Sequence, residues 1–350
     1  MTNPYAGRPP AHFWKTAVAE VPGGQVIPLA PAAKAFRLAP TDRLATAGSC
    51  FAQNVARHLR ASGRVRFLQT EPLADDDPVF SGRYGNIYTA RQLLQLTTEV
   101  LDGPVDAACA IRRSDGRFVD ANRPFITAAG FASAAEVLAA RVAHLAAIRP
   151  VFTDADVFVF TLGLTEAWLS ADGSRAYPVC PGIYADDLGH PYRFHNFGVA
   201  EVTADMEAFL VRLAAVNPGA KVLLTVSPVP LTATATDDHI LTATMMSKAV
   251  LRAVAGDLAA RFSHVYYFPS YEMIANPFMA GHAYADNLRS VDPGAIARVM
   301  AVFDSHYLGD AAPAPAPVAA PIAAPAVGDD GKPRDDVICD DVQIERSIGF

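Results

Sequence analysis

The stretch RLATAGSCFAQNVARHLRASG, residues 43–63, carries the pattern from which we infer the fold. Its first part, Arg43–Ala47, predicts a short buried strand. After Gly48 and Ser49 the spacing becomes helical up to Gly63. The apolar residues at that spacing are Ala52, Val55, Ala56 and Leu59. The stretch therefore predicts a strand, a tight turn and a helix.

Short apolar runs and helical stretches alternate along the rest of the chain, which is typical of a parallel sheet with helices on both faces. We expect further strands at Val65–Leu68, Asp156–Thr161, Lys221–Val226 and His264–Phe268. We expect helices at Ser133–Ile148, Ala204–Val216, Thr242–Phe262 and Pro293–Phe303. Small or polar residues follow the strong strands, and ligands bind at that edge of open α/β sheets. We therefore expect the functional site there.

Two segments, Asn86–Arg149 and Trp168–Val202, are longer than ordinary connections between elements. We expect them to supply a helical cap and a substrate-facing loop. Trp168 and Tyr184 in the second segment are candidates for stacking on a sugar, although aromatic residues also commonly pack in cores.

Composition narrows the classes of protein to which the chain can belong. A hydrophobic fraction of 51% and a charged fraction of 19% are typical of a folded protein. The net charge is −7 without any basic cluster, so we expect no nucleic-acid partner. The first ten residues do not resemble a signal peptide, and no apolar run approaches the roughly 20 residues of a membrane span. We therefore expect a cytoplasmic protein without a membrane partner.

Four cysteines are scattered along the chain with no C-x-x-C pair, which argues against a disulfide scaffold or a structural zinc site. They are Cys50, Cys109, Cys180 and Cys339. The histidines show no metal-ligand spacing, and the glycines form no phosphate-binding loop. We expect neither a metal nor an organic cofactor.

Sequence character divides the chain into four parts. An N-terminal arm covers residues 1–40, and one large domain covers 41–308. Residues 309–336 contain an Ala/Pro-rich linker, because repeated proline prevents helical hydrogen bonding. The tail, residues 337–350, carries isolated apolar residues among acids. It either contacts something, such as another protein, or stays loose.

Ser49 lies between the predicted strand and helix, where exposed helix amides can stabilise an oxyanion. Its hydroxyl is a candidate nucleophile. The alternative is that Ser49 simply caps the helix, which is a frequent use of serine. Cys50 is a second candidate nucleophile, and its alternative is packing as a small apolar residue.

The run Ala47-Gly-Ser-Cys-Phe-Ala-Gln-Asn-Val-Ala-Arg-His-Leu59 closely resembles the defining signature of the GSCFA family, a branch of the SGNH/GDSL hydrolase clan. The resemblance covers roughly residues 40 to 305. It continues through Tyr84–Tyr88, Thr161–Trp168, Thr225–Val229 with Ser247-Lys248, and Phe268–Glu272. It implies a flavodoxin-like three-layer α/β sandwich with a central parallel sheet, of the SGNH-hydrolase type.

The clan resemblance further implies that Ser49 attacks an ester carbonyl with the help of three oxyanion donors. Its own amide would be the first donor, and an amide near Gly85 and Asn86 the second. The third block should read Gly-x-Asn, and here it reads Gly163-Leu164-Thr165-Glu166. Thr165 would replace the asparagine in part, or Thr165 and Glu166 would cap a following helix.

The fifth block departs further from the clan, where Asp-x-x-His supplies the base and the acid that orients it. The chain reads Tyr284-Ala-Asp-Asn-Leu-Arg-Ser-Val291, so the pair maps onto Asp286 with Arg289, or onto Asn287 with Ser290. Neither register contains an imidazole, and arginine cannot accept a proton from serine.

Histidines elsewhere in the chain remain candidates for the base, because spatial neighbours need not be sequence neighbours. They are His282, His195 and His239, and each has the alternative of an ordinary loop histidine. Arg289 suits recognition of a carboxylate or phosphate, or pairs with Asp286 or Asp292 as plain structure.

Two functional hypotheses follow. The first is a serine esterase or acyltransferase that acts on an O-acyl ester of a saccharide or another small molecule, with Ser49 as nucleophile and His282 and Asp286 as partners. The second is a binding or regulatory protein that has kept the fold and lost the base.

Overall fold

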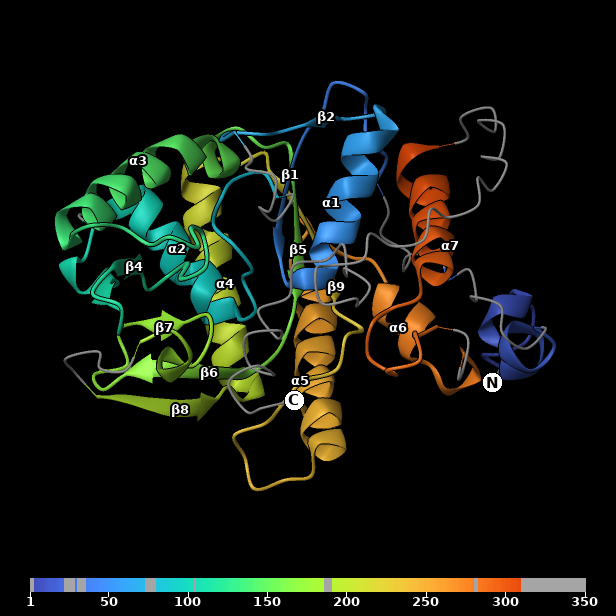
Figure 1. The fold of residues 1–350 in the computed structure, drawn as a ribbon. Coiled ribbons are helices and arrows are strands. Elements are labelled where there is room, and N and C mark those ends of the chain that lie inside the picture. Colours follow the sequence, from blue (N-terminus) through green and yellow to red (C-terminus); the bar gives the residue numbers. More distant parts are fainter. Residues whose placement is uncertain are drawn as a thin grey trace, which may run out of the picture.

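The computed structural model describes residues 3–21, 29, 36–72, 80–103, 105–185, 191–279 and 283–309. Within these ranges a sheet of five parallel strands forms the centre (Figure 1). Its strands are β1 (Arg43–Gly48), β2 (Arg66–Phe67), β5 (Val157–Leu162), β9 (Lys221–Val226) and β10 (Val265–Tyr267). All neighbouring pairs in this sheet run parallel. The predicted α/β class with a central parallel sheet is confirmed.

The strand order is β10-β9-β5-β1-β2. Counted in chain order within this sheet, it is the order 2-1-3-4-5 of doubly wound folds. The chain moves from β1 outward to β2 and then crosses back to β5, on the other side of β1. Such a reversal separates the loops that leave β1 and β5, and the crevice between them is the preferred ligand site of open α/β sheets.

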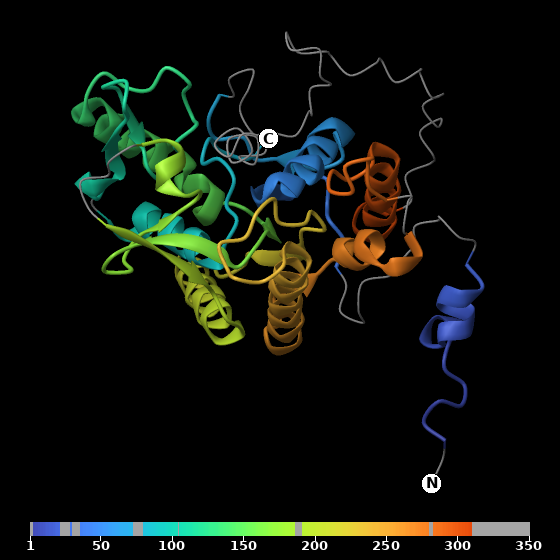
Figure 2. The ribbon, with the colours of Figure 1, turned by 60° about the horizontal axis from the view of Figure 1, so that its bottom comes forward.

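Seven α-helices in the described ranges cover the sheet. They are α1 (Cys50–Ser62), α2 (Ala90–Asp102), α3 (Ala134–Thr153), α4 (Val199–Val216), α5 (Ile240–Arg261), α6 (Ser270–Ala275) and α7 (Pro293–Phe303). Figures 1 and 2 show α1, α6 and α7 together on one side, and α2, α3 and α4 on the other. None of the described helices is long and apolar enough to span a membrane.

Alternation along the strands explains the two layers, because successive side chains point to opposite faces. On β5, Phe158 and Phe160 pack with α2 to α5, whereas Val157 and Val159 pack with α1, α6 and α7. On β1, Ala45 faces the first cluster and Leu44 faces the second. Each face of the sheet therefore has its own apolar core.

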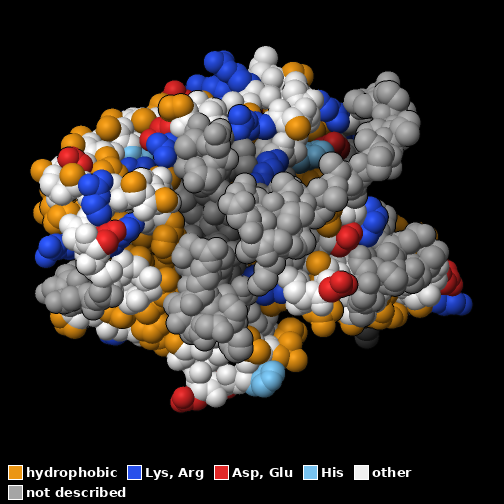
Figure 3. Space-filling model, in the orientation of Figure 1, with side chains coloured by type: hydrophobic (Ala, Val, Ile, Leu, Met, Phe, Trp, Pro, Cys, Tyr) orange, Lys and Arg blue, Asp and Glu red, His pale blue; other side chains and the backbone are white. Residues whose placement is uncertain are grey.

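Several smaller elements accompany the central sheet and its helices. A hairpin joins β3 (Ala110–Arg112) and β4 (Phe118–Asp120), and a three-stranded antiparallel sheet contains β6 (Glu166–Ser170), β7 (Ala176–Tyr177) and β8 (Tyr192–Asn196). The short helical turns are η1 (Pro10–His12), η2 (Lys15–Ala19), η3 (Ala107–Cys109), η4 (Pro181–Ile183), η5 (Pro277–Met279) and η6 (Asp304–Leu308). On the face drawn in Figure 3, the visible Lys and Arg side chains are scattered among acidic and apolar ones.

The structure corrects two expectations about elements. The segment Asn86–Arg149 was expected to form a cap, but its helices α2 and α3 pack on the sheet through Leu93 and Ile148. The predicted helix end at Ile148 is wrong as well, because α3 continues through Pro150 to Thr153. Burial of Val151 and Phe152 in the core accounts for this continuation. The bounds of α7 agree with the prediction.

Candidate active site at the ends of β1 and β5

The turn between β1 and α1 holds Ser49 in an unusual position. Gly48 has φ 141°, and a Cβ there would lie 2.6 Å from the Thr161 carbonyl oxygen, so only glycine fits. Ser49 follows in extended conformation, and α1 begins at Cys50. The Ser49 side chain is 2% exposed and makes no capping hydrogen bond. Ser49 thus occupies the N-cap position of α1, but its side chain does not cap the helix.

Within the described part of the chain, the Ser49 hydroxyl makes no hydrogen bond. Leaving a buried hydroxyl without a partner costs stability, typically about 1–3 kcal/mol. Groups with such a cost concentrate at functional sites, where a ligand supplies the partner. The Ser49 hydroxyl is therefore a group that a bound ligand could satisfy.

Three separate segments meet around Ser49. Gly163, at the end of β5, has no room for a side chain, because its Cβ would lie 2.9 Å from Ser49 Cβ and 3.0 Å from the Tyr88 carbonyl oxygen. The amides of Gly163 and Leu164 both donate to that Tyr88 oxygen, at 3.0 and 3.1 Å. The Ile87 amide donates to the Gly48 oxygen at 2.8 Å. The segments around residues 48, 88 and 163 are thus held together by close packing and by backbone hydrogen bonds.

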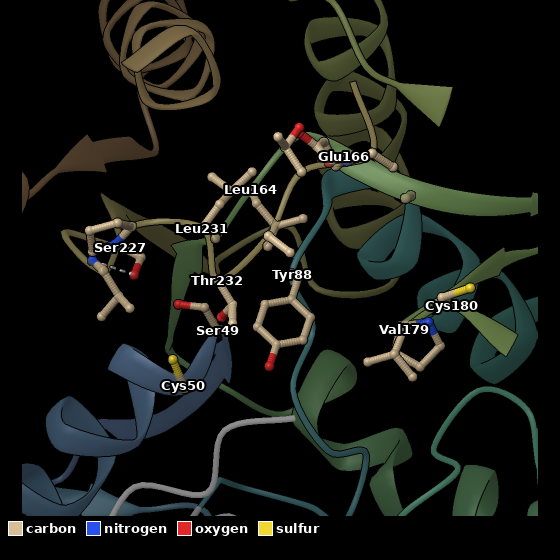
Figure 4. A pocket seen from close by; sticks show the side chains of 18 of the residues that line it. Ser49, Cys50, Tyr88, Leu164, Glu166, Val179, Cys180, Ser227, Leu231 and Thr232 are labelled. Atoms are coloured by element: carbon tan, nitrogen blue, oxygen red, sulfur yellow. Dashed lines mark hydrogen bonds between the residues drawn. The ribbon is translucent and has the colours of Figure 1, made fainter. Parts of the chain in front are cut away.

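Ser49 lines a cavity of about 190 Å³. Its wall is mainly apolar, and it includes three segments besides the strand ends: the start of β6, the turn before η4, and the loop after β9. Figure 4 shows Ser49 at the start of α1 near Tyr88 and Thr232, with Val179 and Cys180 on another wall. The cavity lies at the β1/β5 reversal, as the strand order predicts.

Six of the candidate site residues named from the sequence line this cavity: Ser49, Cys50, Gly163, Glu166, Trp168 and Arg289. The Trp168 ring also contacts Tyr192 and Phe194 edge-on. Tyr184 is not among the lining residues and instead stacks edge-on against Phe125. The segment after Trp168 therefore contributes a cavity wall, as expected, through residues 178–183.

Glu166 anchors a wall of the cavity. One carboxylate oxygen accepts from the Thr234 hydroxyl at 2.6 Å, and the other accepts from the Ala235 amide at 3.1 Å. Both bonds hold the loop that contains Leu231–Ala235 over the cavity. The expectation that Thr165 and Glu166 cap a helix is wrong, because β6 begins at Glu166.

The groups predicted to donate to an oxyanion are not arranged in the structure as the sequence led us to expect. The Ser49 amide donates to the Thr161 oxygen at 3.2 Å. Thr165 is buried beneath the cavity wall, where its hydroxyl lies 2.7 Å from Asn196 Oδ1 and its amide donates to Ser247 Oγ. Thr165 therefore does not replace the expected asparagine as a donor.

Gly85 and Asn86 also lie outside the wall of the Ser49 cavity. Gly85 has φ 72°, which its turn requires, and the Asn86 side chain accepts from Gln53 Nε2 at 3.0 Å. Asn86 lines a separate space of about 20 Å³ instead. The structure thus gives these two residues a role in shaping the turn before Tyr88.

The acid and the histidines proposed as catalytic partners are placed elsewhere. Asp286 is exposed and does not line the cavity. The Nε2 atom of His195, on β8, lies 2.7 Å from Glu201 Oε1 on α4. His239 caps α5 by accepting from the Leu241 amide. Neither histidine lines the cavity. His282 lies outside the described residues, so its position stays a prediction.

The fifth block forms a turn. Asn287 Nδ2 donates to Ser290 Oγ at 3.0 Å, and Leu288 between them has φ 52°. The two positions of the second register are therefore bonded to each other. Arg289 projects from this turn into the cavity wall. Asp292 caps α7 by accepting from the Ala295 amide at 3.0 Å.

Sequence reasoning missed one charged residue in the wall, Lys248 on α5. A signal was present, since Lys248 falls on the buried stripe of that helix together with Thr244, Ser247, Leu251 and Ala255. A lysine on the apolar side of a predicted helix marks an unusual position.

A family model described as the GSCFA family matches residues 43–303, which is well over half of the chain. The chain belongs to the GSCFA family. The GSCFA match runs from β1 through α7 and so includes every residue that lines the Ser49 cavity. No curated protein matches the chain.

Proposed function

We propose that this GSCFA protein is a serine esterase or acyltransferase that acts on an O-acyl ester. The observation that carries the proposal is the buried Ser49 hydroxyl, which has no hydrogen-bond partner in the described chain and lines a cavity at the β1/β5 reversal. A nucleophile must be free to attack and must face the space that its substrate enters, and the unbonded Ser49 hydroxyl in the cavity wall supports both conditions.

In the proposed reaction, Ser49 Oγ attacks the ester carbonyl carbon and loses its proton. The carbonyl electron pair moves to oxygen, and the oxyanion collapses to expel the alcohol and leave an acyl-serine. Water or a second alcohol then attacks the acyl-serine, which gives hydrolysis or acyl transfer. Hydrolysis occurs if water enters the cavity, and acyl transfer occurs if a second alcohol enters it.

The N-terminus of α1 is the proposed oxyanion site. The first turn of a helix leaves N–H groups without intrahelical acceptors, and here those groups belong to Cys50 and Phe51, directly after Ser49. Oriented amides of this kind stabilise a developing negative charge. The helix thus replaces the side-chain donor that the third block lacks.

The cavity wall supports a small acyl ester as substrate. Apolar residues such as Leu164, Val179 and Leu231 suit an acyl group, and the Trp168 ring offers a face for a saccharide. Arg289 adds a positive charge that suits a carboxylate or phosphate on the same ligand.

A binding protein without catalysis is the second candidate. The observation that favours it is the exposed position of Asp286, together with the absence of any histidine among the described residues that line the cavity. In this case the cavity would retain an ester or its acid without bond cleavage.

Reaction with a fluorophosphonate probe separates the two candidates. The esterase proposal expects covalent labelling of the wild type and hydrolysis of p-nitrophenyl acetate, both lost in Ser49→Ala. Ser62→Ala, at the other end of α1, is the matched control and should label normally, since Ser62 Oγ bonds the Leu59 carbonyl and the Arg64 amide, away from the cavity. Cys50→Ala should also label. A wild type that neither labels nor turns over would favour the binding protein.

A further inference from the structure

Lys248 is a buried lysine in the wall of the Ser49 cavity. It is 3% exposed and lies on the stripe of α5 that faces the sheet. Its ε-amino group donates to the Gly163 carbonyl oxygen at 2.5 Å. Lysine is among the residues least often buried, because removing an ammonium from water is costly.

Gly163 connects Lys248 to Ser49. Its carbonyl oxygen receives the Lys248 amine, and its α-carbon packs against the Ser49 side chain so closely that a Cβ would lie 2.9 Å from Ser49 Cβ. One residue therefore separates the amine from the serine, and both line the same cavity.

The other charged groups in the described wall, Glu166 and Arg289, are poorly suited to take a proton from Ser49. Both oxygens of Glu166 already accept hydrogen bonds from the loop at Thr234 and Ala235. Arg289 remains protonated at all ordinary pH values. Cys180 lies on a different wall from Ser49 in Figure 4, and Cys50 is an apolar neighbour at the start of α1.

We propose that Lys248, as the uncharged amine, is the base that accepts the Ser49 proton. The inference rests on the proposed acyl-transfer function. Burial favours the amine over the ammonium, and lysine in such surroundings serves as a base in Ser–Lys hydrolases. Because no hydrogen bond joins Lys248 to Ser49 here, the proton passes through one water or after a rotation of the lysine chain.

The proton balance closes over one turnover. The Ser49 O–H bond breaks as the Oγ–carbon bond forms, and the proton moves to Lys248 Nζ. When the tetrahedral intermediate collapses, the ammonium returns that proton to the departing alkoxide. Water then attacks the acyl-serine, gives a proton to the same amine, and the amine returns it to Ser49 as the acid leaves.

The test measures the rate of fluorophosphonate labelling and of p-nitrophenyl acetate hydrolysis in the full-length protein. Lys248→Met removes the amine, and Lys248→Arg keeps a nitrogen donor for the Gly163 carbonyl but cannot accept a proton. Both should be slower by about 10²–10⁴-fold, the usual contribution of a general base. Lys221→Met is the matched control and should react normally, because Lys221 lies over the Phe36 ring away from the cavity.

Two further readouts distinguish a base from a structural lysine. Wild-type labelling should accelerate as pH rises and the amine loses its proton, and this rise should vanish in Lys248→Arg. Added methylamine should restore part of the activity of Lys248→Ala. These readouts stand even if Lys248→Met fails to fold, which thermal unfolding would reveal.

Normal labelling of Lys248→Arg, with labelling lost in Ser49→Ala, would overturn the role of Lys248 and leave the esterase proposal standing. Absence of labelling in the wild type would overturn the esterase proposal itself, and the role of Lys248 with it. The two failures are therefore distinguishable in one set of variants.

Discussion

At the scale of single residues, two glycines decide how close the strand ends approach one another. Gly48 lets β1 turn sharply against Thr161, and Gly163 lets β5 pass directly beneath Ser49. In each case a methyl group would meet backbone atoms, which cannot move aside as the end of a flexible side chain can. Close backbone approach, together with the hydrogen bond from the Ser49 amide to the Thr161 oxygen, therefore fixes the position of Ser49.

Gly163→Ala tests this requirement. A Cβ at this position lies 2.9 Å from Ser49 Cβ and 3.0 Å from the Tyr88 oxygen, so the strand end must shift. We expect a loss of about 1–3 kcal/mol in the free energy of unfolding, as for other overpacked sites, and slower fluorophosphonate labelling. Urea unfolding of Gly163→Ala and of Gly219→Ala checks it, since nothing lies within 4 Å of a Cβ at Gly219. Equal losses would contradict the argument.

At the scale of elements, a buried ionic network ties α3 to α2 and to the β3–β4 hairpin. Arg141 on α3 pairs with Glu99 on α2 and lies 3.3 Å from Asp120 on β4. Asp120 also accepts from Arg123 at 2.8 Å. Arg141 and Asp120 are 2% and 1% exposed, so neither charge can be satisfied by water. These elements stay together because separating them would leave buried charges unpaired.

Replacement of Arg141 by methionine keeps most of its volume and removes its charge. Because Glu99 would then lose its partner, we expect the free energy of unfolding to fall by about 3–5 kcal/mol, as when a buried pair is broken. The matched control is Arg261→Met, which breaks the more exposed pairs of Arg261 with Asp257 and Glu207 and should cost far less. Urea unfolding midpoints of the two variants would show the contrast, and similar costs would argue against the network.

From the buried His144 on α3 we predict how the stability of the fold depends on pH. Burial, and then the nearby charges of Arg123 and Arg141, lower its pKa to about 4, even though its Nδ1 lies 2.8 Å from Glu71 Oε2. The unfolded chain takes up this proton below about pH 6.5, whereas the folded chain does so only near pH 4. The unfolded state thus binds more protons within this window, and stability is lost as pH falls through it.

The free energy of unfolding should therefore drop between pH 7 and pH 4.5 in the wild type. In His144→Gln the drop should be much smaller, since glutamine does not titrate. His306→Gln is the control, because His306 also has a lowered pKa but its burial is slight. Parallel pH curves for the wild type and His144→Gln would show that His144 does not control this dependence.

The sequence predicted the helices and strands well where its apolar pattern is periodic. It predicted them poorly where contacts between distant segments determine the local structure. Strand β1, helix α1 and the position of Ser49 follow from the spacing in residues 43–63, and the structure confirms them. The sequence did not reveal that β6, rather than a helix, follows Thr165, because pairing with β8 determines that strand. Likewise, Asp286 appeared catalytic from its motif, yet its turn leaves it exposed.

At the scale of the whole molecule, described residues on both sides of the family match belong to the core beside α1 and α7. The core beside α1 and α7 ends with Phe303 and Tyr307, and Arg64 donates to the Leu308 and Gly309 carbonyls. The amide of Leu38 donates to the Tyr307 oxygen at 2.7 Å, which ties the segment before β1 to the segment after α7. The folded unit thus needs residues on both sides of the family match.

A chain that lacks residues 1–40 should lose stability, because the buried Leu38 and its bond to Tyr307 disappear. Calorimetry of this chain and of the full chain at matched concentration checks the expectation. An unchanged unfolding temperature would contradict a contribution of Leu38 to the fold.

The bond between Glu166 and the loop at Thr234 and Ala235 has an evolutionary consequence. The loop is held by the Glu166 carboxylate and by the bond from the Leu231 amide to Thr244 Oγ1, whereas Ser49 is set by Gly48 and Gly163 at the ends of two strands. Mutations that lengthen, shorten or exchange residues 231–235 can therefore reshape the cavity wall while Ser49 keeps its place. Related chains that carry such changes would differ in the shape of the cavity and share the position of Ser49.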